Sequence, residues 1–173
     1  MKNIVVADFD ETLLPYDSEN VYVYKQIRRG NIKILTWFLL RKLKIISYAK
    51  FVEYLQNEMS KKDLTAFVNK LYADIDQEVL NQVLSYKNEH SEMILLSASP
   101  HCYIEKVAEK INFKGYGSTY YDGKFRQLYD VNKAIFIQEK YPKTDYRYTF
   151  SISDSETDLT LLKLFEKYEL IKK

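Results

Sequence analysis

The sequence has little cysteine and no long apolar run. Cys102 is its only cysteine, so no disulfide forms within the chain and nothing indicates an oxidising compartment. No apolar run approaches the roughly 20 residues that a bilayer-spanning helix needs. The first apolar segment starts so close to Met1 that no signal peptide fits before it. We therefore expect a cytoplasmic, globular protein.

Chain-breaking residues and net charge are also scarce. Four glycines and three prolines among 173 residues favour long helices joined by short connections. The formal net charge of +2 is too small to indicate a nucleic-acid-binding protein, so no nucleic-acid partner is expected. A chain of this length with 46% apolar and 29% charged residues predicts one globular domain with room for an insertion.

Apolar strand patterns alternate with helical patterns along the chain. The predicted strands cover residues 3–7, 93–96, 115–121 and 146–152, and the predicted helices cover 18–29, 32–46, 48–59, 62–72, 76–90, 134–140 and 159–168. Ser60 is expected to cap the fourth helix, Pro100 to open a further helix, and residues 121–124 to form a hairpin turn. This alternation predicts an α/β fold, in which helices cover both faces of a parallel sheet.

Two carboxylates follow the first predicted strand. Asp8 and Asp10 are two residues apart, and alternate side chains of a strand share a face, so both start out facing one small volume. Like charges this close are costly unless a cation or a shared proton relieves them. The pair therefore indicates a divalent metal site, or an acid and a nucleophile acting on phosphate. An ordinary turn after a strand uses similar residues, so the residues farther along the chain decide.

Polar side chains also follow the later strands. Ser97 precedes a predicted helix N-terminus, where free N–H groups attract anions. Asp154 and Asp158 follow the last apolar strand at a spacing that shares one helical face, and Lys133 lies between these motifs. Taken singly, Ser97 and Ser99 could be helix caps and Lys133 a surface lysine. The order along the chain, a carboxylate pair, a hydroxyl, a lysine and a second carboxylate pair, is hard to obtain by coincidence. The acids and the hydroxyl also follow strands, and ligands of open α/β sheets bind beyond the carboxyl ends of the strands.

These motifs resemble those of the haloacid dehalogenase (HAD) superfamily of phosphohydrolases. The resemblance is carried by Asp8-Phe9-Asp10-Glu11-Thr12-Leu13, Ile94-Leu95-Leu96-Ser97, Lys133 and Ser153-Asp154-Ser155-Glu156-Thr157-Asp158. It implies a Rossmann-like core of residues 1–16 and 89–173. It also implies an all-helical cap of residues 17–88, similar to the cap of the phosphoserine-phosphatase-like subfamily. Ser97-Ala98-Ser99-Pro100 lacks the glycines that follow this serine in phosphoserine phosphatases, which weighs against phosphoserine as the substrate.

The resemblance implies a Mg²⁺-dependent phosphatase, a phosphoric monoester hydrolase that acts on a small phosphomonoester. Asp8 would attack phosphorus and form an aspartyl-phosphate, while Asp10 would act first as general acid and then as general base. The carboxylates of Asp8 and Asp154 and the backbone carbonyl of Asp10 would hold the Mg²⁺ ion.

The resemblance assigns supporting roles to four other residues. Ser97 and Lys133 would bind the phosphoryl group and neutralise its charge. Thr12 would fix the loop that positions Asp10, and Asp158 would orient Lys133 or a metal-bound water. The alternatives on the same scaffold are a phosphotransferase, a lipid-phosphate phosphatase at a membrane surface, and a non-catalytic phosphate-binding regulator.

The first half of the helical insertion is strongly basic. It contains eight Lys and Arg residues and no acid between Glu19 and Glu53. One interpretation is a helix that packs its apolar side on its neighbours and leaves the lysines in water. The other is a basic amphipathic surface that touches anionic membranes. The sequence predicts no particular oligomeric state.

Overall fold

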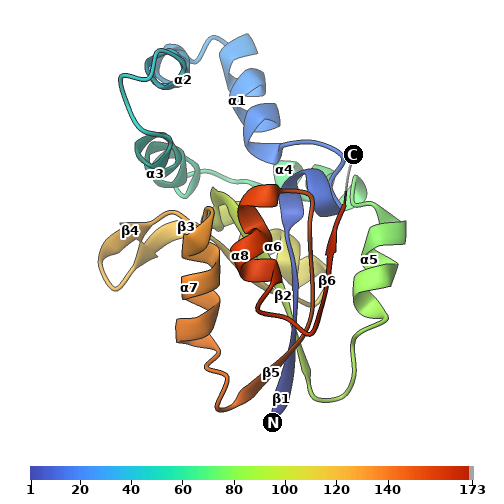
Figure 1. Ribbon diagram of the computed structural model, residues 1–173. Helices are drawn as coiled ribbons and strands as arrows, with labels where there is room; N and C mark the ends of the chain where they lie inside the picture. Colours follow the sequence, from blue (N-terminus) through green and yellow to red (C-terminus); the bar gives the residue numbers. More distant parts are fainter. Residues whose placement is uncertain (172–173) are drawn as a thin grey trace.

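The computed structural model describes residues 1–171, and a six-stranded sheet forms the centre of the fold (Figure 1). Its strands are β1 (Lys2–Ala7), β2 (Ser91–Pro100), β3 (Lys114–Tyr121), β4 (Lys124–Arg126), β5 (Tyr146–Ser153) and β6 (Lys167–Leu170). They lie in the order β4-β3-β2-β1-β5-β6, and β4 pairs antiparallel with β3 whereas the other neighbours pair in parallel. The carboxyl ends of the parallel strands therefore share one edge of the sheet.

Helices cover both faces of this sheet. The α-helices of residues 1–171 are α1 (Ser18–Arg28), α2 (Ile32–Lys42), α3 (Tyr48–Met59), α4 (Thr65–Ala73), α5 (Gln77–Leu84), α6 (His101–Lys110), α7 (Val131–Lys140) and α8 (Leu159–Leu162), and those that flank the sheet are α5 and α6 on one face and α7 and α8 on the other. On the central strand, Ile4 and Val6 pack with α7 and α8, whereas Val5 and Ala7 pack with α5 and α6 on the other face. Since strand side chains alternate, burial on both faces explains the continuous apolar run of β1. The predicted α/β fold with a parallel sheet between helices is confirmed.

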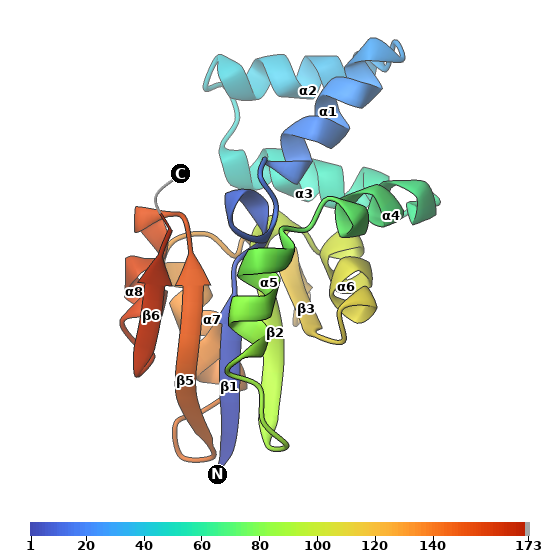
Figure 2. The ribbon, with the colours of Figure 1, turned by 90° about the vertical axis from the view of Figure 1, so that its right-hand side faces the viewer.

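Five helices, α1 to α5, connect β1 to β2. Four of them begin at a side-chain cap, because Asp17, Asn31, Ser47 and Asp76 each accept a backbone N–H from the following turn. In Figure 2, α1, α2 and α3 lie beyond the carboxyl ends of the strands, whereas α5 lies along the sheet. The backbone N–H of Asp76 donates to the carbonyl of Leu13 at 2.8 Å, which ties the start of α5 to the loop after β1.

Several predicted element boundaries are wrong. Ser60 ends α3, and α4 starts after Leu64 without a side-chain cap. The predicted second helix stops at Lys42 because Lys44 adopts a left-handed φ of 59°, and the fifth stops at Leu84. The predicted last helix stops at Leu162, and the chain returns as β6 beside β5. Pairing at a sheet edge is a long-range contact, which local periodicity does not reveal.

The hairpin turn between β3 and β4 is confirmed. Asp122 and Gly123 both have positive φ, 51° and 77°, which is the conformation that two-residue hairpin turns favour.

No helix among residues 1–171 is long and apolar enough to span a bilayer.

Candidate active site

A cavity of about 140 Å³ lies where β1, β2 and β5 end and α7 begins, a volume that corresponds to roughly four to five water molecules. In an open α/β sheet, this edge is where ligands bind. Six of the residues predicted from sequence line the cavity: Asp8, Asp10, Ser97, Lys133, Asp154 and Asp158. The seventh, Thr12, is fully buried and contacts two of them. The structure therefore brings all seven predicted side chains together.

Lys133 is buried between two carboxylates. Its Nζ lies 2.6 Å from Asp8 Oδ1 and 2.6 Å from Asp158 Oδ2, and the Ser153 hydroxyl donates to the same Asp158 oxygen at 2.7 Å. Burial raises the pKa of Asp8 to about 7; the charge of Lys133 opposes this rise and that of Asp158 adds to it. Burial lowers the pKa of Lys133, but the two carboxylates outweigh it and raise the pKa overall. Lys133 is therefore charged, and it is the one cation between these two carboxyl groups among the residues that line the cavity.

The start of α7 presents Lys133 to the cavity. The residue before the helix, Asp130, has φ 54° and ψ −136°, a region that side-chain-bearing residues rarely adopt and that costs on the order of 1–3 kcal/mol. The Lys133 N–H donates to the Asp130 carbonyl at 3.1 Å. Ala134 and Ile137 anchor the helix in the core below. The sequence predicted Lys133 just ahead of a helix, and it lies in the first turn.

Asp10 lies in the same cavity but has different partners. Its Oδ1 accepts the Ser18 N–H at 2.7 Å and also the Ser18 hydroxyl. Its Oδ2 accepts the hydroxyls of Ser97 at 2.9 Å and Ser99 at 2.7 Å. The hydroxyl of the fully buried Tyr103 lies 2.8 Å from Ser18 Oγ and supports this arrangement from behind. Hydroxyl and backbone donors therefore surround Asp10, whereas an ammonium faces Asp8.

The capping interpretation of Ser97 and Ser99 is wrong. β2 continues to Pro100, and α6 begins at His101 without a side-chain cap. Both serines belong to the extended strand, and residues two apart on a strand share one side, so both hydroxyls reach Asp10. Sequence reasoning missed Ser99 and Ser18 as members of the site. Ser99 could have been identified, because it is two residues after Ser97 and so lies on the same side of a strand. No local pattern in the sequence identifies Ser18.

Thr12 joins the carboxylates of two separate strands. Its Oγ1 lies 3.1 Å from Asp8 Oδ2 and 2.9 Å from Asp154 Oδ1, and it accepts the Asp154 N–H at 2.9 Å. A threonine has one hydroxyl proton, so Thr12 can donate to only one of the two carboxylates at a time. Because both carboxylates lie within 3.1 Å of the same hydroxyl oxygen, Asp8 and Asp154 lie close together.

The donor set fits a small, hard cation. Carboxylate and carbonyl oxygens are the ligands that Mg²⁺ prefers, and the cavity holds more acid than base. No group of three or more Asp, Glu, His or Cys side chains converges as a ligand set among residues 1–171. The predicted Mg²⁺ ligands do not require such a group of three side chains, because they are the carboxylates of Asp8 and Asp154 and the backbone carbonyl of Asp10.

The cavity is also lined by residues to which the sequence alone assigned no role. Asp17, Tyr48 and Tyr129 line it, and the rings of Tyr48 and Tyr129 meet edge to face with centres 6.2 Å apart. The Tyr48 hydroxyl donates to the buried Glu19 at 3.3 Å. Burial and the charge of Asp10 raise the pKa of Asp17 to about 6, and burial raises the pKa of Glu19 to about 8. This part of the lining therefore combines aromatic rings with carboxyl groups.

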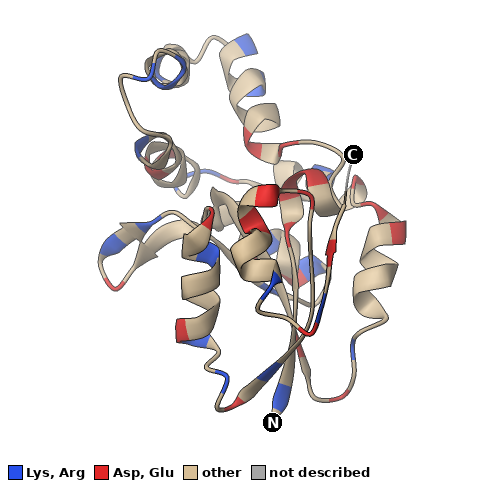
Figure 3. Ribbon diagram, in the orientation of Figure 1, with Lys and Arg blue, Asp and Glu red and all other residues tan. Residues whose placement is uncertain are grey.

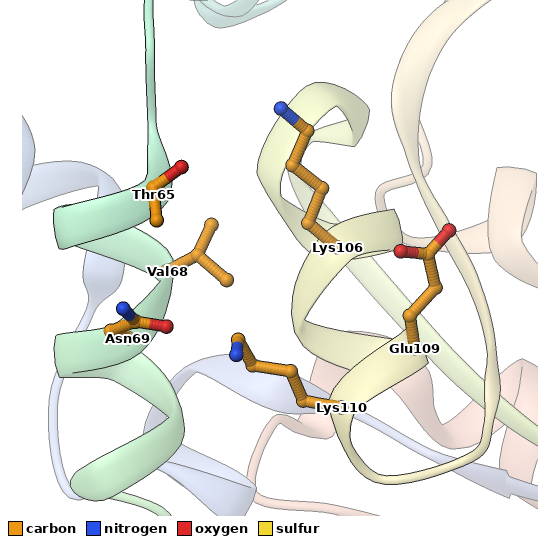
Figure 4. A pocket seen from close by; sticks show the side chains of 6 residues that line it. All are labelled: Thr65, Val68, Asn69, Lys106, Glu109 and Lys110. Atoms are coloured by element: carbon orange, nitrogen blue, oxygen red, sulfur yellow. The ribbon is translucent and has the colours of Figure 1, made fainter.

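A second cavity, of about 450 Å³, lies between α4 and α6 (Figure 4). Its lining consists of Thr65, Val68, Asn69, Lys106, Glu109 and Lys110. None of the predicted site residues lines it, and only one of its side chains is a carboxylate. This cavity therefore lacks the cluster of carboxylates around a lysine that lines the smaller cavity.

Solved structures share this fold. A protein of unknown function from Bordetella pertussis Tohama I has a TM-score of 0.73 at 14% identity, over 97% of this chain and 89% of that chain. A phosphoserine phosphatase from T. onnurineus has a TM-score of 0.53 at 16% identity, over 97% of this chain and 82% of that chain. A phospho-aspartyl intermediate analogue of phosphoserine phosphatase has a TM-score of 0.50 at 16% identity, over 96% of this chain and 85% of that chain.

At these identities the likeness shows a common fold. Comparison with curated proteins gives no match. A family model of haloacid dehalogenase-like hydrolases matches residues 5–163, which include every predicted site residue. The predicted family is confirmed: the chain belongs to the haloacid dehalogenase-like hydrolases.

Proposed function

We propose that this hydrolase is a Mg²⁺-dependent phosphatase that cleaves a small phosphomonoester through an aspartyl-phosphate on Asp8. The observation that carries the proposal is the division of environments between Asp8 and Asp10 within one cavity. Asp8 faces the Lys133 ammonium, whereas serine hydroxyls surround Asp10. A nucleophile and an acid–base group need such different surroundings. The fold shared with a phospho-aspartyl analogue of phosphoserine phosphatase supports the same chemistry.

In the first step, a carboxylate oxygen of Asp8 forms a bond to phosphorus while the bond between phosphorus and the leaving oxygen breaks. Asp10 gives its proton to that leaving oxygen. In the second step, water attacks phosphorus, Asp10 takes the water's proton, and the bond to Asp8 breaks. Inorganic phosphate leaves, and both aspartates return to their starting states. Lys133 neutralises charge on the phosphoryl group throughout.

The serines around Asp10 suit both of its protonation states. A hydroxyl can donate or accept a hydrogen bond, so Ser97 and Ser99 donate to the carboxylate and can accept from the carboxylic acid after rotation. Either serine can therefore follow the proton without moving Asp10. Ser97 also lines the cavity, and in this proposal its hydroxyl turns to a phosphoryl oxygen when substrate binds.

The negative charge of the site supports a resident Mg²⁺ ion. Asp8, Asp154 and the Asp10 carbonyl would hold it. When bound, the ion offsets repulsion between the anionic carboxylate and the anionic ester. Asp158 contacts Lys133 at 2.6 Å, which favours the role of orienting Lys133 over that of orienting a metal-bound water.

The helices α1 to α4 act as a cap in this proposal. The sequence-based cap of residues 17–88 includes α5, but α5 lies along the sheet (Figure 2), so we assign it to the core. Asp17, at the N-cap of α1, and Tyr48, at the start of α3, line the cavity from the side of the cap. They contact the leaving group, and the volume of about 140 Å³ favours a small one at the reacting end.

The test is phosphate release from a panel of phosphomonoesters with and without Mg²⁺. The panel contains phosphoserine, sugar phosphates, nucleotides and a short-chain lipid phosphate, and Asp8→Asn serves as the blank. We expect Mg²⁺-dependent release that disappears in the variant. Full activity of the purified variant, or no release of phosphate by folded wild-type protein, would contradict the proposal.

A further inference from the structure

Helix α2 exposes an apolar stripe on its outward side. Ile32, Leu35, Leu39 and Leu43 are 74%, 36%, 49% and 69% exposed. Because successive residues of a helix are rotated by about 100°, the first three of these side chains lie within an arc of roughly 60°, and Leu43 follows at the C-cap of the helix. Ile34 lies on the opposite side of the helix and is buried in the core. The stripe is therefore additional to the face that holds α2 on the protein.

An exposed stripe of this kind is unusual for a helix that has only water around it. A helix that is apolar on both sides is normally buried on both, and contiguous exposed apolar patches often mark binding surfaces. In Figure 2, α2 lies at the end of the molecule farthest from the sheet. No described part of the chain covers its outward side.

Positive charge surrounds the stripe. Between residues 20 and 52 the chain has eight cationic side chains and no acid; they are Lys25, Arg28, Arg29, Lys33, Arg41, Lys42, Lys44 and Lys50. All except Arg41 are exposed. Figure 3 shows basic and no acidic segments on α2 and on the adjoining end of α1. An anionic partner therefore fits this end of the molecule.

A basic recess adjoins the end of the stripe. It has a volume of about 580 Å³ and is lined by Arg41, Lys42, Lys44, Ile46, Ser47 and Tyr48. The Nε–H of Arg41 is buried and has no hydrogen-bond partner among the described residues. Its guanidinium lies 4.5 Å from the centre of the Tyr48 ring. The three cationic side chains and the Ser47 hydroxyl of this lining thus suit a phosphate group of a lipid.

We propose that α2 and the turn after it, residues 32–45, dock the protein on an anionic membrane surface. The aliphatic side chains enter the boundary between headgroups and acyl chains, and the surrounding Lys and Arg side chains contact the anionic headgroups. A second copy of this chain is a poorer occupant. A two-fold interface would place this basic surface against itself, and like charges repel.

The docking proposal does not depend on the proposed reaction. Tyr48 lines both the basic recess and the candidate active site, so a docked protein holds its active site close to the membrane. If the phosphatase proposal fails, membrane binding is still expected, because it rests on the apolar and cationic side chains in and around residues 32–45, none of which has a role in the proposed reaction.

Co-sedimentation with vesicles tests the proposal. The full chain is mixed at low salt with phosphatidylcholine vesicles, with or without phosphatidylglycerol. We expect binding to the anionic vesicles only, weakened by salt through screening. The double variant Leu39→Ser, Leu43→Ser should bind at least about tenfold more weakly, and so should Lys42→Glu, Lys44→Glu. The control Tyr72→Ser removes a similarly exposed side chain, 43% exposed, from α4 and should bind like the wild type.

Three results would overturn the proposal. The first is no binding of the wild type to anionic vesicles at low salt. The second is equal binding to neutral and anionic vesicles. The third is a dimer, measured by size-exclusion chromatography with light scattering, that the leucine variant disperses while vesicle binding stays unchanged. That last result would assign the stripe to contact between copies. Circular dichroism of each variant verifies that it is folded.

Discussion

Replacing Asp8 with asparagine is expected to abolish turnover and, at the same time, to stabilise the metal-free protein at pH 8. Asparagine keeps the shape of aspartate without its charge, and its carbonyl oxygen can still accept from Lys133. Burial raises the pKa of Asp8 from 3.8 to about 7, and each pKa unit corresponds to about 1.4 kcal/mol. Ionised Asp8 therefore costs the fold on the order of 4 kcal/mol. For a chain of this size, the variant should melt roughly 8–16 °C higher than the wild type.

The pH dependence follows from the direction of this shift. Between about pH 4 and pH 7, folded protein keeps a proton on Asp8 that the unfolded chain has released, so Asp8 makes the wild type less stable as pH rises through this window. The gap between variant and wild type should be near zero at pH 4 and complete above pH 7. Added Mg²⁺ should narrow it, because a ligand that binds the folded wild type stabilises it.

Thermal unfolding followed by circular dichroism in EDTA, at several pH values, measures this gap. Asp145→Asn is the matched control, because Asp145 is exposed and its replacement should leave the melting temperature nearly unchanged. An Asp8→Asn variant that melts at or below the wild-type temperature at pH 8 would refute the reasoning. So would a stabilisation that is equally large at pH 4.

Four other changes have expected outcomes. Lys133→Met leaves two buried carboxylates without their shared cation and should lower the free energy of unfolding by about 3–5 kcal/mol; an unchanged urea midpoint would contradict this. Ser99→Ala removes one donor to Asp10 and should lower kcat by about tenfold or more with little change in KM. An unchanged kcat would show that Ser99 has no role in the reaction. In Gly117→Ala, the new Cβ would lie 2.6 Å from the Ser99 carbonyl oxygen and 2.7 Å from His101 Cα. We therefore expect the free energy of unfolding to fall by about 1–3 kcal/mol and the activity to fall as well. A variant as stable and active as the wild type would be inconsistent with that contact. Removal of divalent ions with EDTA should abolish phosphate release and Mg²⁺ should restore it, whereas activity that persists in EDTA would exclude a required Mg²⁺ ion.

Features that depend on neighbouring residues could be predicted from the sequence. The apolar run before Asp8 predicted the central strand, because a strand buried on both faces needs apolar residues at every position. Helical periodicity located α1 and α3 closely. The order of polar residues at the ends of strands predicted that Asp8, Ser97 and Asp154 would meet, since parallel strands bring their carboxyl ends to one edge.

Features that depend on pairing between distant segments required the tertiary structure. Lys133 lies 125 residues after Asp8 in the chain, yet the two side chains are 2.6 Å apart, because α7 packs on the face of the sheet with its first turn beside the carboxyl end of β1. In the same way, Ser18 reaches Asp10 and Tyr48 reaches the cavity only because α1 and α3 lie over the strand ends. Local patterns record which side chains are buried and which elements they form. The register of the sheet and the packing of the crossovers decide which of those side chains become partners, and the site depends on these partners.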